Sequence, residues 1–101
     1  MVYRLSAHFP PEEKFGLTSQ IRRAAVSVAA NMAEGAERTG TKEFLHFLSI
    51  ASGSLAETET FLILADRLGL ATKEQTKPLQ AQAADVGRML NGLKRSLRSK
   101  I

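Results

Sequence analysis

Two long segments with a helical spacing of apolar residues dominate this chain, and only the short break AERTGT separates them. Both lie within residues 17–68, where apolar residues recur at alternating steps of three and four, the period of one helix face. A glycine near the end of so short a break favours a tight reversal. Residues 17–68 therefore predict an antiparallel helix pair onto which the rest of the chain packs.

The first segment carries an apolar stripe with a polar stripe beside it. The apolar residues that share one face are Ile21, Ala25, Val28, Met32 and Gly35. The polar residues with the same spacing are Arg23, Ser27, Asn31, Glu34 and Arg38. Because arginine and glutamate are rarely buried without partners, the polar stripe is either a solvated edge or a hydrogen-bonded seam, and composition favours the solvated edge.

The second segment is apolar on more than one side. Its heptad-like seam comprises Phe44, Leu48, Ala51, Leu55, Thr58, Leu62, Ala65 and Gly69. Five further apolar residues lie outside the seam, namely Leu45, Ile50, Phe61, Ile63 and Leu64. A helix that is apolar on nearly all sides is usually buried on more than one of them. These five residues are therefore expected to form an oligomer interface.

The residues around the predicted helix pair indicate where each helix begins and ends. Residues 2–9 are expected to end a helix at Pro10 and Pro11, because a residue before proline is pushed out of the helical region, and residues 11–14 suit one helical turn. Thr18 or Ser19 is the expected N-cap of the second helix and Thr41 that of the third, after a stop at Gly40. Gly35 is either a close-packing residue or part of the helix exit. Gly53, inside the third helix, is expected to allow close approach of another backbone.

The last helix begins with a capping box and carries most of the positive charge. Thr72 and Gln75 match the capping box, and Pro78 predicts either a kink or a restart of the helix. Beyond it, an apolar stripe comprises Leu79, Ala83, Val86, Leu90, Leu93 and Leu97. The chain has a net charge of +4. Residues 86–101 hold five cations and no acid, which leaves −1 for residues 1–85.

The five cations are the best functional clue in the sequence. They are Arg88, Lys94, Arg95, Arg98 and Lys100, and they are expected to contact nucleic-acid phosphates, with Arg22 and Arg23 extending the patch. The alternative is a solvated helix end, where cations complement the dipole in any case. Oligomerisation would present the patch several times and magnify a weak contact.

Catalytic and metal-binding motifs are scarce. The chain has no cysteine, and the single E-x-x-H motif, Glu43 to His46, lacks the second motif of a di-iron bundle, while His8 lies beside the two prolines. Neither a nucleophile elbow nor a phosphate loop is present. Carboxylate pairing among Glu34, Glu57 and Glu59 is possible, but pairing of Glu34 and Glu57 with arginine is favoured. No enzyme activity, metal or cofactor is expected.

Sequence also bears on location and on domain count. No apolar run reaches the ~18 residues of a membrane span, and the N-terminus lacks an apolar signal core. A cytoplasmic protein without membrane contact is therefore expected. The length of 101 residues suits one domain, residues 1–101.

Three blocks of sequence resemble a known family. They are Asn31, Ala33, Glu34, Gly35 and Arg38; Ala51, Gly53, Ser54, Leu55 and Glu57; and, with one register difference around Pro11, Phe9, Pro10, Glu12, Gly16, Leu17, Thr18 and Gln20. In this order the blocks resemble the 23S rRNA intervening sequence proteins, over roughly residues 3–98. That group in turn resembles the accessory proteins of diversity-generating retroelements, which act beside a reverse transcriptase and bind nucleic acid.

The resemblance implies a fold and an assembly more than an activity. It implies a homopentamer of four-helix bundles, with RNA, DNA or a protein such as a reverse transcriptase as partner. Members of the family start earlier, so the first helix is expected to be short here, through a downstream start or trimming, and part of the bundle groove to be uncovered. The block residues Asn31, Glu34, Arg38, Ser54 and Glu57 are expected to form one structural polar network across two helices.

The sequence as a whole predicts an all-α, up-down antiparallel four-helix bundle with a shortened first helix. Its expected function is that of a non-enzymatic, homo-oligomeric nucleic-acid-binding or ribonucleoprotein-accessory protein. The alternative is a structural or protein-interaction module without a nucleic-acid role. Within the polar network, Glu57 is expected to be substantially buried and bonded to an arginine or asparagine of the preceding helix.

Overall fold

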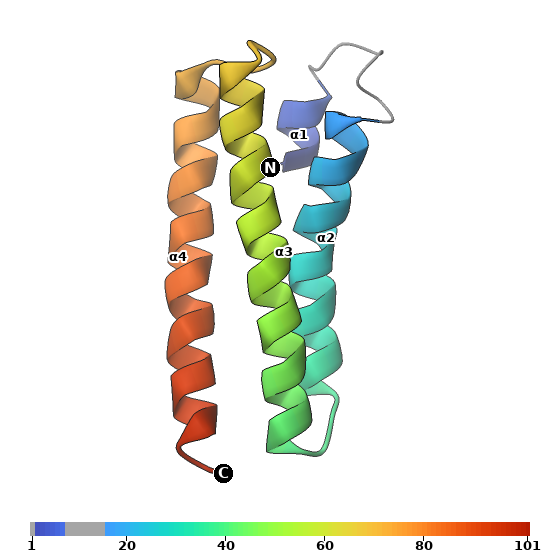
Figure 1. Ribbon diagram of the computed structural model, residues 1–101, viewed down its shortest axis with the longest axis vertical. Helices are drawn as coiled ribbons and strands as arrows, with labels where there is room; N and C mark the ends of the chain where they lie inside the picture. The colour runs from blue at the N-terminus through green and yellow to red at the C-terminus, as the bar shows by residue number, and fades with distance from the viewer. Residues whose placement is uncertain (1, 8–15) are drawn as a thin grey trace.

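The structure is a computed structural model that describes residues 2–7 and 16–101. These residues form the helices α1 (Val2–Ser6), α2 (Leu17–Ala36), α3 (Thr41–Arg67) and α4 (Lys73–Arg98). The three long helices run antiparallel to their neighbours in an elongated body of 46 × 23 × 16 Å (Figure 1). The predicted all-α four-helix bundle with a short first helix is confirmed. The break at Pro10 and Pro11 and the turn at 11–14 lie outside the described residues.

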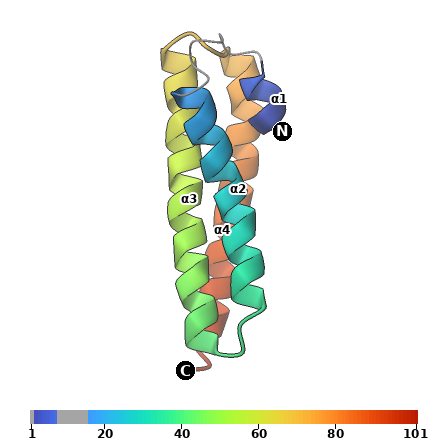
Figure 2. The ribbon, with the colours of Figure 1, turned by 90° about the vertical axis from the view of Figure 1, so that its right-hand side faces the viewer.

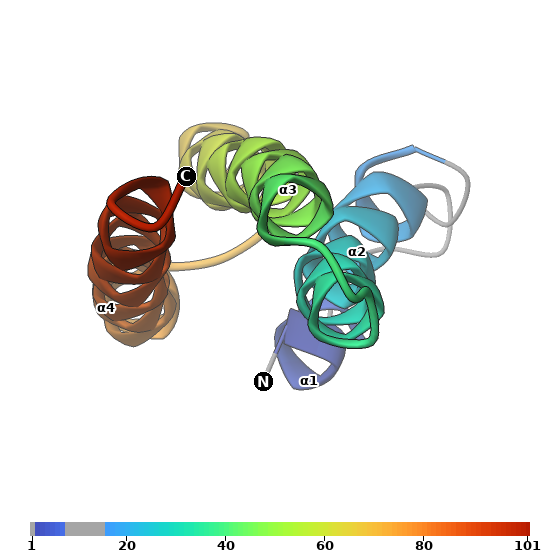
Figure 3. The same ribbon diagram turned by 90° about the horizontal axis from the view of Figure 1, so that it is seen from below.

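Helix α3 is the centre of the bundle. It packs extensively against α2 and less extensively against α4, whereas α2 and α4 make no comparable contact with each other. Seen from below, α2 and α4 diverge from opposite sides of α3 (Figure 3). The predicted seam is buried at Leu48, Ala51, Leu55, Thr58, Leu62 and Ala65. The periodicity of the sequence therefore identified the face of α3 that holds the bundle together.

The core has two clusters, one at each end of the long helices. The upper cluster includes α1 and comprises Val2, Leu5, Ile21, Leu62, Ala65, Ala71 and Leu79. The lower cluster has no α1 residue and comprises Val28, Leu48, Ala51, Leu55, Ala83, Leu90 and Leu97. Because α1 lies only beside the upper half of α2 (Figure 2), the lower half of the bundle is built from α2, α3 and α4 without a fourth helix.

Helix α1 is held in place by α2. A helix of five residues is not stable by itself, but the side chains of Val2 and Leu5 are buried in the upper cluster. The Arg22 Nε donates a hydrogen bond to the Ser6 Oγ at 2.6 Å, and the guanidinium lies 4.9 Å from the centre of the Tyr3 ring. Arg22 thus fastens α1 to α2.

The predicted N-caps are wrong: Thr18 and Ser19 lie two and three residues after the cap of α2, and Thr41 lies one residue after the cap of α3. Helix α2 begins after Gly16 and α3 after Gly40, and neither cap makes a side-chain hydrogen bond. Helix α2 has already begun at Leu17, so Thr18 lies in its first turn, where its side chain is buried. In the same way Thr41 is the first residue of α3 rather than its cap.

The connection from α3 to α4 consists of a helix end at Gly69 and the predicted capping box at the start of α4. Gly69 has a φ of +73°, its N–H donates to the Asp66 carbonyl, and the Leu70 N–H donates to the Ala65 carbonyl. These two bonds make a Schellman motif, in which glycine avoids the steric cost of a left-handed residue. The capping box of Thr72 and Gln75 is confirmed. Pro78 neither ends nor restarts α4, which continues from Lys73 to Arg98.

Glycines at two positions have opposite surroundings. A Cβ atom on Gly35 would lie 2.9 Å from both the Phe44 Cδ1 and the Phe47 Cβ, so Gly35 is a close-packing residue between α2 and α3. No atom lies within 4 Å of such a position at Gly53. Within the chain, the expected close approach at Gly53 is therefore wrong, because Gly53 itself lies on the exposed side of α3.

We expect Gly35→Ala to lower the free energy of unfolding by about 1–3 kcal/mol, because the added methyl group overpacks the α2–α3 contact. The matched variant Gly53→Ala should raise it by up to about 1 kcal/mol, through improved helix propensity in open space. Urea unfolding followed by circular dichroism measures both. Equal effects of the two substitutions would contradict the close packing at Gly35.

Candidate nucleic-acid interface and apolar surfaces

Three cations at the end of α4 are free. Arg95, Arg98 and Lys100 are exposed, and among the described residues none forms an ion pair or a hydrogen bond with their side chains. Their positions in the last turns of α4 and just beyond place them at the lower end of the bundle (Figure 1). We call these three residues the basic end.

Two other cations of α4 already have partners. The Arg88 guanidinium pairs with the Asp85 carboxylate on the same helix. The Lys94 Nζ donates a hydrogen bond to the Ser52 Oγ at 2.9 Å, which ties α4 to α3. The ion pair between Asp85 and Arg88 could have been predicted from their spacing of three residues on one helix. The bond between Lys94 and Ser52 depends on how α3 and α4 are aligned.

The structure does not bring Arg22 and Arg23 to the basic end. Both lie in the second turn of α2, at the upper end of the bundle, opposite to the end of α4 (Figure 1). Arg22 is engaged with α1, and the Arg23 Nη2 lies 3.0 Å from the Glu57 Oε2. The expectation that these arginines extend the patch is therefore wrong within one chain.

The stretch of α3 beside the basic end does not neutralise it. Helices α3 and α4 run antiparallel, and the bond between Lys94 and Ser52 places the first half of α3 beside the last turns of α4. That half has no charged residue from Phe44 to Ala56. An anionic partner would therefore meet no like charge on this stretch.

The expected polar network is divided into three parts. Ser54 and Ser27 share a hydrogen bond of 2.8 Å across α2 and α3, and the Asn31 Nδ2 donates to the Ser27 Oγ at 2.9 Å. The Arg38 Nη2, two residues beyond the end of α2, donates to the Glu34 Oε1 at 2.5 Å. Sequence reasoning placed Ser27 on the polar stripe but did not include it in the network.

The third part is the pair of Arg23 and Glu57, and it is exposed. The expectation of a bond from Glu57 to an arginine of α2 is confirmed. Its substantial burial is wrong, because 47% of its side chain is exposed. Residue 57 lies one position before the buried Thr58 on α3, which turns its side chain about 100° away from the seam. Pairing of Glu34 and Glu57 with arginine is also what the sequence favoured over paired carboxylates.

Only some of the five apolar residues that were expected to form an oligomer interface on α3 are exposed. Ile50, Ile63 and Leu64 have exposed fractions of 39%, 43% and 39%. Leu45 and Phe61 are instead half-buried and pack against the lower and upper core clusters. The predicted interface therefore contracts to the three exposed residues, which we call the outer α3 face.

Helix α3 is also long and apolar enough to cross a membrane by length and composition alone. The core helix of a soluble bundle meets the same criteria, so this observation is weak evidence for a membrane span. Of the apolar window that meets them, 33% is buried inside the chain. Much of the apolar surface of α3 is thus left without a partner in one chain.

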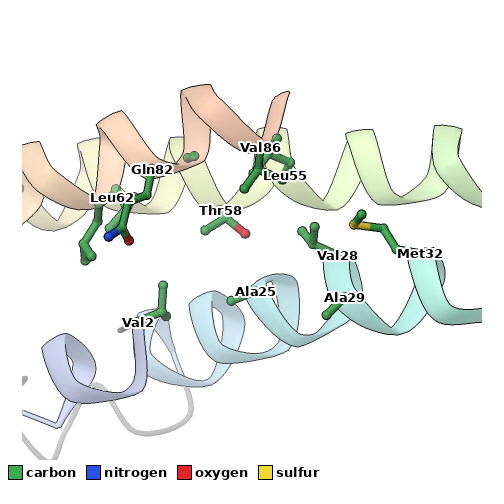
Figure 4. A pocket seen from close by; sticks show the side chains of 12 residues that line it. Val2, Ala25, Val28, Ala29, Met32, Leu55, Thr58, Leu62, Gln82 and Val86 are labelled. Carbon is green, nitrogen blue, oxygen red and sulfur yellow. The ribbon is translucent and has the colours of Figure 1, made fainter. Parts of the chain in front are cut away.

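A second apolar surface is the groove between α2 and α4. Its volume is about 260 Å³, and α3 forms its floor (Figure 4). The residues that line it are Val2, Ala25, Val28, Ala29, Met32, Leu55, Thr58, Leu62, Leu79, Gln82, Ala83 and Val86. Val2 of α1 closes its upper part. Since the floor is the buried face of α3, this groove and the outer α3 face lie on opposite sides of the molecule.

Within residues 2–7 and 16–101, no three histidine, aspartate or glutamate side chains gather in a way that could hold a metal ion. Glu43 lies in the first turn of α3, and His46 is exposed with its ring against Phe47. His8 lies outside the described residues.

The fold and these surfaces can be compared with known proteins. The family model of the 23S rRNA-intervening sequence protein matches residues 1–92. The chain belongs to this family. A crystal structure of a protein of unknown function from the S23 ribosomal protein family of Bacteroides thetaiotaomicron is 24% identical, with a TM-score of 0.79 over 93% of this chain and 98% of that one. Among curated proteins, none matches this sequence.

The structural match shows that this intervening sequence protein shares the helical bundle of the Bacteroides protein. The family block residues have different environments in the structure. Ser54 is 6% exposed, whereas Glu34, Arg38 and Glu57 lie at the surface.

We expect Ser54→Ala to lower the free energy of unfolding by about 1 kcal/mol, because it removes the partner of Ser27 at the α2–α3 contact. Glu57→Ala should cost less than about 1 kcal/mol, as exposed ion pairs contribute little. Thermal melts of the two variants provide the comparison. A larger loss for Glu57→Ala than for Ser54→Ala would mean that Glu57 is covered in the assembled protein.

Proposed function

We propose that this intervening sequence protein is a non-enzymatic, self-associating helical bundle that binds nucleic acid through the basic end of α4. The observation that supports it most is the set of three free cations, Arg95, Arg98 and Lys100, beside a stretch of α3, residues 44–56, that has no charged residue. Free arginine and lysine side chains can replace the counterions of phosphates, which is the main source of sequence-independent affinity.

The arrangement favours binding over catalysis. Among the described carboxylates, Glu34, Glu57 and Asp85 are each paired with an arginine at the surface, which is not the unpaired, desolvated setting of a general acid or base. A protein of this kind would hold or position a nucleic acid for other factors.

Self-association is the second element of the proposal. The outer α3 face and the groove between α2 and α4 are both apolar and lie on opposite sides of the molecule. Contact between two different surfaces is heterologous, and such contacts close into rings when the rotation permits. The family resemblance suggests a pentamer; the apolar surfaces alone support any closed assembly, which would bring several basic ends together.

A second candidate function is that of a protein-interaction module. The same two apolar surfaces support it, because an amphipathic helix of another protein could cover either of them. In that case nucleic-acid binding would be weak and insensitive to the basic end, and the partner would be a protein such as a reverse transcriptase.

Replacing Arg95, Arg98 and Lys100 by alanine should weaken binding to RNA and DNA of any sequence. It should also flatten the dependence of log K on log salt by about one unit for each phosphate that is no longer bound. Fluorescence anisotropy over a salt series measures both. The control replaces Arg4, Arg67 and Lys73, which removes the same charge from the upper end. Equal losses of affinity in the two triple variants would assign binding to net charge instead of the basic end.

Light scattering coupled to size exclusion should give several times the chain mass of 11.0 kDa, with five copies as the leading expectation. Leu64→Lys should lower that mass, because it places a charge on the outer α3 face. Leu68→Lys, at an exposed leucine just beyond the end of α3, is the matched control and should not. A monomeric parent protein at micromolar concentration would contradict self-association.

A further inference from the structure

The surroundings of the basic end indicate what kind of nucleic acid it fits. Proteins that bind single strands combine a positively charged groove with aromatic side chains, on which successive bases stack. Proteins that bind duplexes by their phosphates need only exposed cations, because the bases are already stacked on one another. The two classes can therefore be distinguished by the shape of the surface and by its aromatic content.

Aromatic side chains are missing from α4. No phenylalanine, tyrosine, tryptophan or histidine occurs after Phe61, so neither α4 nor the residues that precede and follow it offer an aromatic ring on which a base could stack. At the lower end of α3, Phe44 and Phe47 face Gly35 of α2, and the Arg38 guanidinium covers the Phe47 ring at 5.0 Å from its centre. His46 is exposed, and its ring contacts Phe47 edge-on.

The basic end is also not part of a groove. The groove of the molecule is apolar and is lined from α4 by Leu79, Gln82, Ala83 and Val86. Arg88 and Arg95 occupy another side of the helix, since each lies more than a quarter-turn from these positions at 100° per residue. Arg95 therefore stands on the side of α4 that faces away from this groove.

The spacing of these cations suits a rigid array of phosphates. Arg95 and Arg98 are three residues apart, which is a rise of about 4.5 Å along α4, and Lys100 follows just beyond the end of the helix. An α-helix holds this spacing without adjustment. A duplex presents phosphates at fixed positions, whereas a single strand would have to be ordered along the helix at a cost in entropy.

From these observations we propose that the α4 surface recognises the phosphodiester backbone of a double-stranded nucleic acid and offers unpaired bases no aromatic side chain on which to stack. This inference rests on the proposed nucleic-acid binding and specifies its substrate class. The sequence of the nucleic acid should matter little, because contacts to phosphates carry no sequence information directly.

The test compares one short sequence of low self-complementarity in four forms: single-stranded RNA, single-stranded DNA and the corresponding RNA and DNA duplexes. Fluorescence anisotropy with the full-length assembly should show roughly tenfold tighter binding of both duplexes than of the single strands, at equal nucleotide concentration and low salt. An oligolysine peptide, measured in the same way, provides a baseline. It gives the preference for duplexes over single strands that charge density alone produces. The preference of the protein should be at least as large as that baseline.

The possible failures are distinguishable. Single strands bound as tightly as duplexes, or a preference well below the oligolysine baseline, would overturn the inference and leave nucleic-acid binding intact. Binding of only one of the two duplexes would also overturn it, because recognition would then depend on more than shared phosphates. No binding of any of the four forms would instead refute the proposed function itself. Affinities for the two duplexes within about fivefold, abolished together in the Arg95, Arg98 and Lys100 variant, would support it.

Discussion

The packing of α2 and α4 onto two edges of α3 is the constraint on which the rest of the structure depends. Glycines on both outer helices permit it: Gly35 of α2 lies against Phe44 and Phe47, and a Cβ on Gly87 of α4 would lie 3.4 Å from the Leu55 Cδ2. Because each outer helix uses its contact surface on α3, the two diverge and leave the apolar groove between them. The short α1 closes only the upper part of that groove.

Polar contacts along these edges determine register more than stability. The hydroxyls of Ser27 and Ser54 meet across α2 and α3, and Lys94 reaches Ser52 across α3 and α4. Each contact can form in only one alignment of its helices, since a shift by one turn would separate the partners by about 5.4 Å. Their net contribution to stability is about 1 kcal/mol each, so the apolar seam supplies most of the free energy.

The periodicity of the sequence predicted those features that a single helix determines by itself. It did not predict contacts and burial that depend on how two helices are aligned. The seam of α3 and the capping box of Thr72 follow from local spacing, and both are present. The burial of Glu57 was wrong because nearness to a seam along the sequence does not fix the side toward which a side chain turns. The bond from Lys94 to Ser52 has no local signature, because it exists only once α4 lies beside α3.

The apolar surfaces and the basic end of this protein lie on different parts of the molecule. One of them can therefore be covered without covering the other. The outer α3 face and the groove are apolar and would be covered by self-association, whereas the basic end lies at the last turns of α4. A partner helix in the groove would contact the side of α4 that carries Gln82 and Val86, not the side that carries Arg95. An assembly formed in this way keeps its cations exposed. Under the proposed function, each added copy would contribute the same small number of phosphate contacts, so avidity would turn a weak basic end into an effective binding surface.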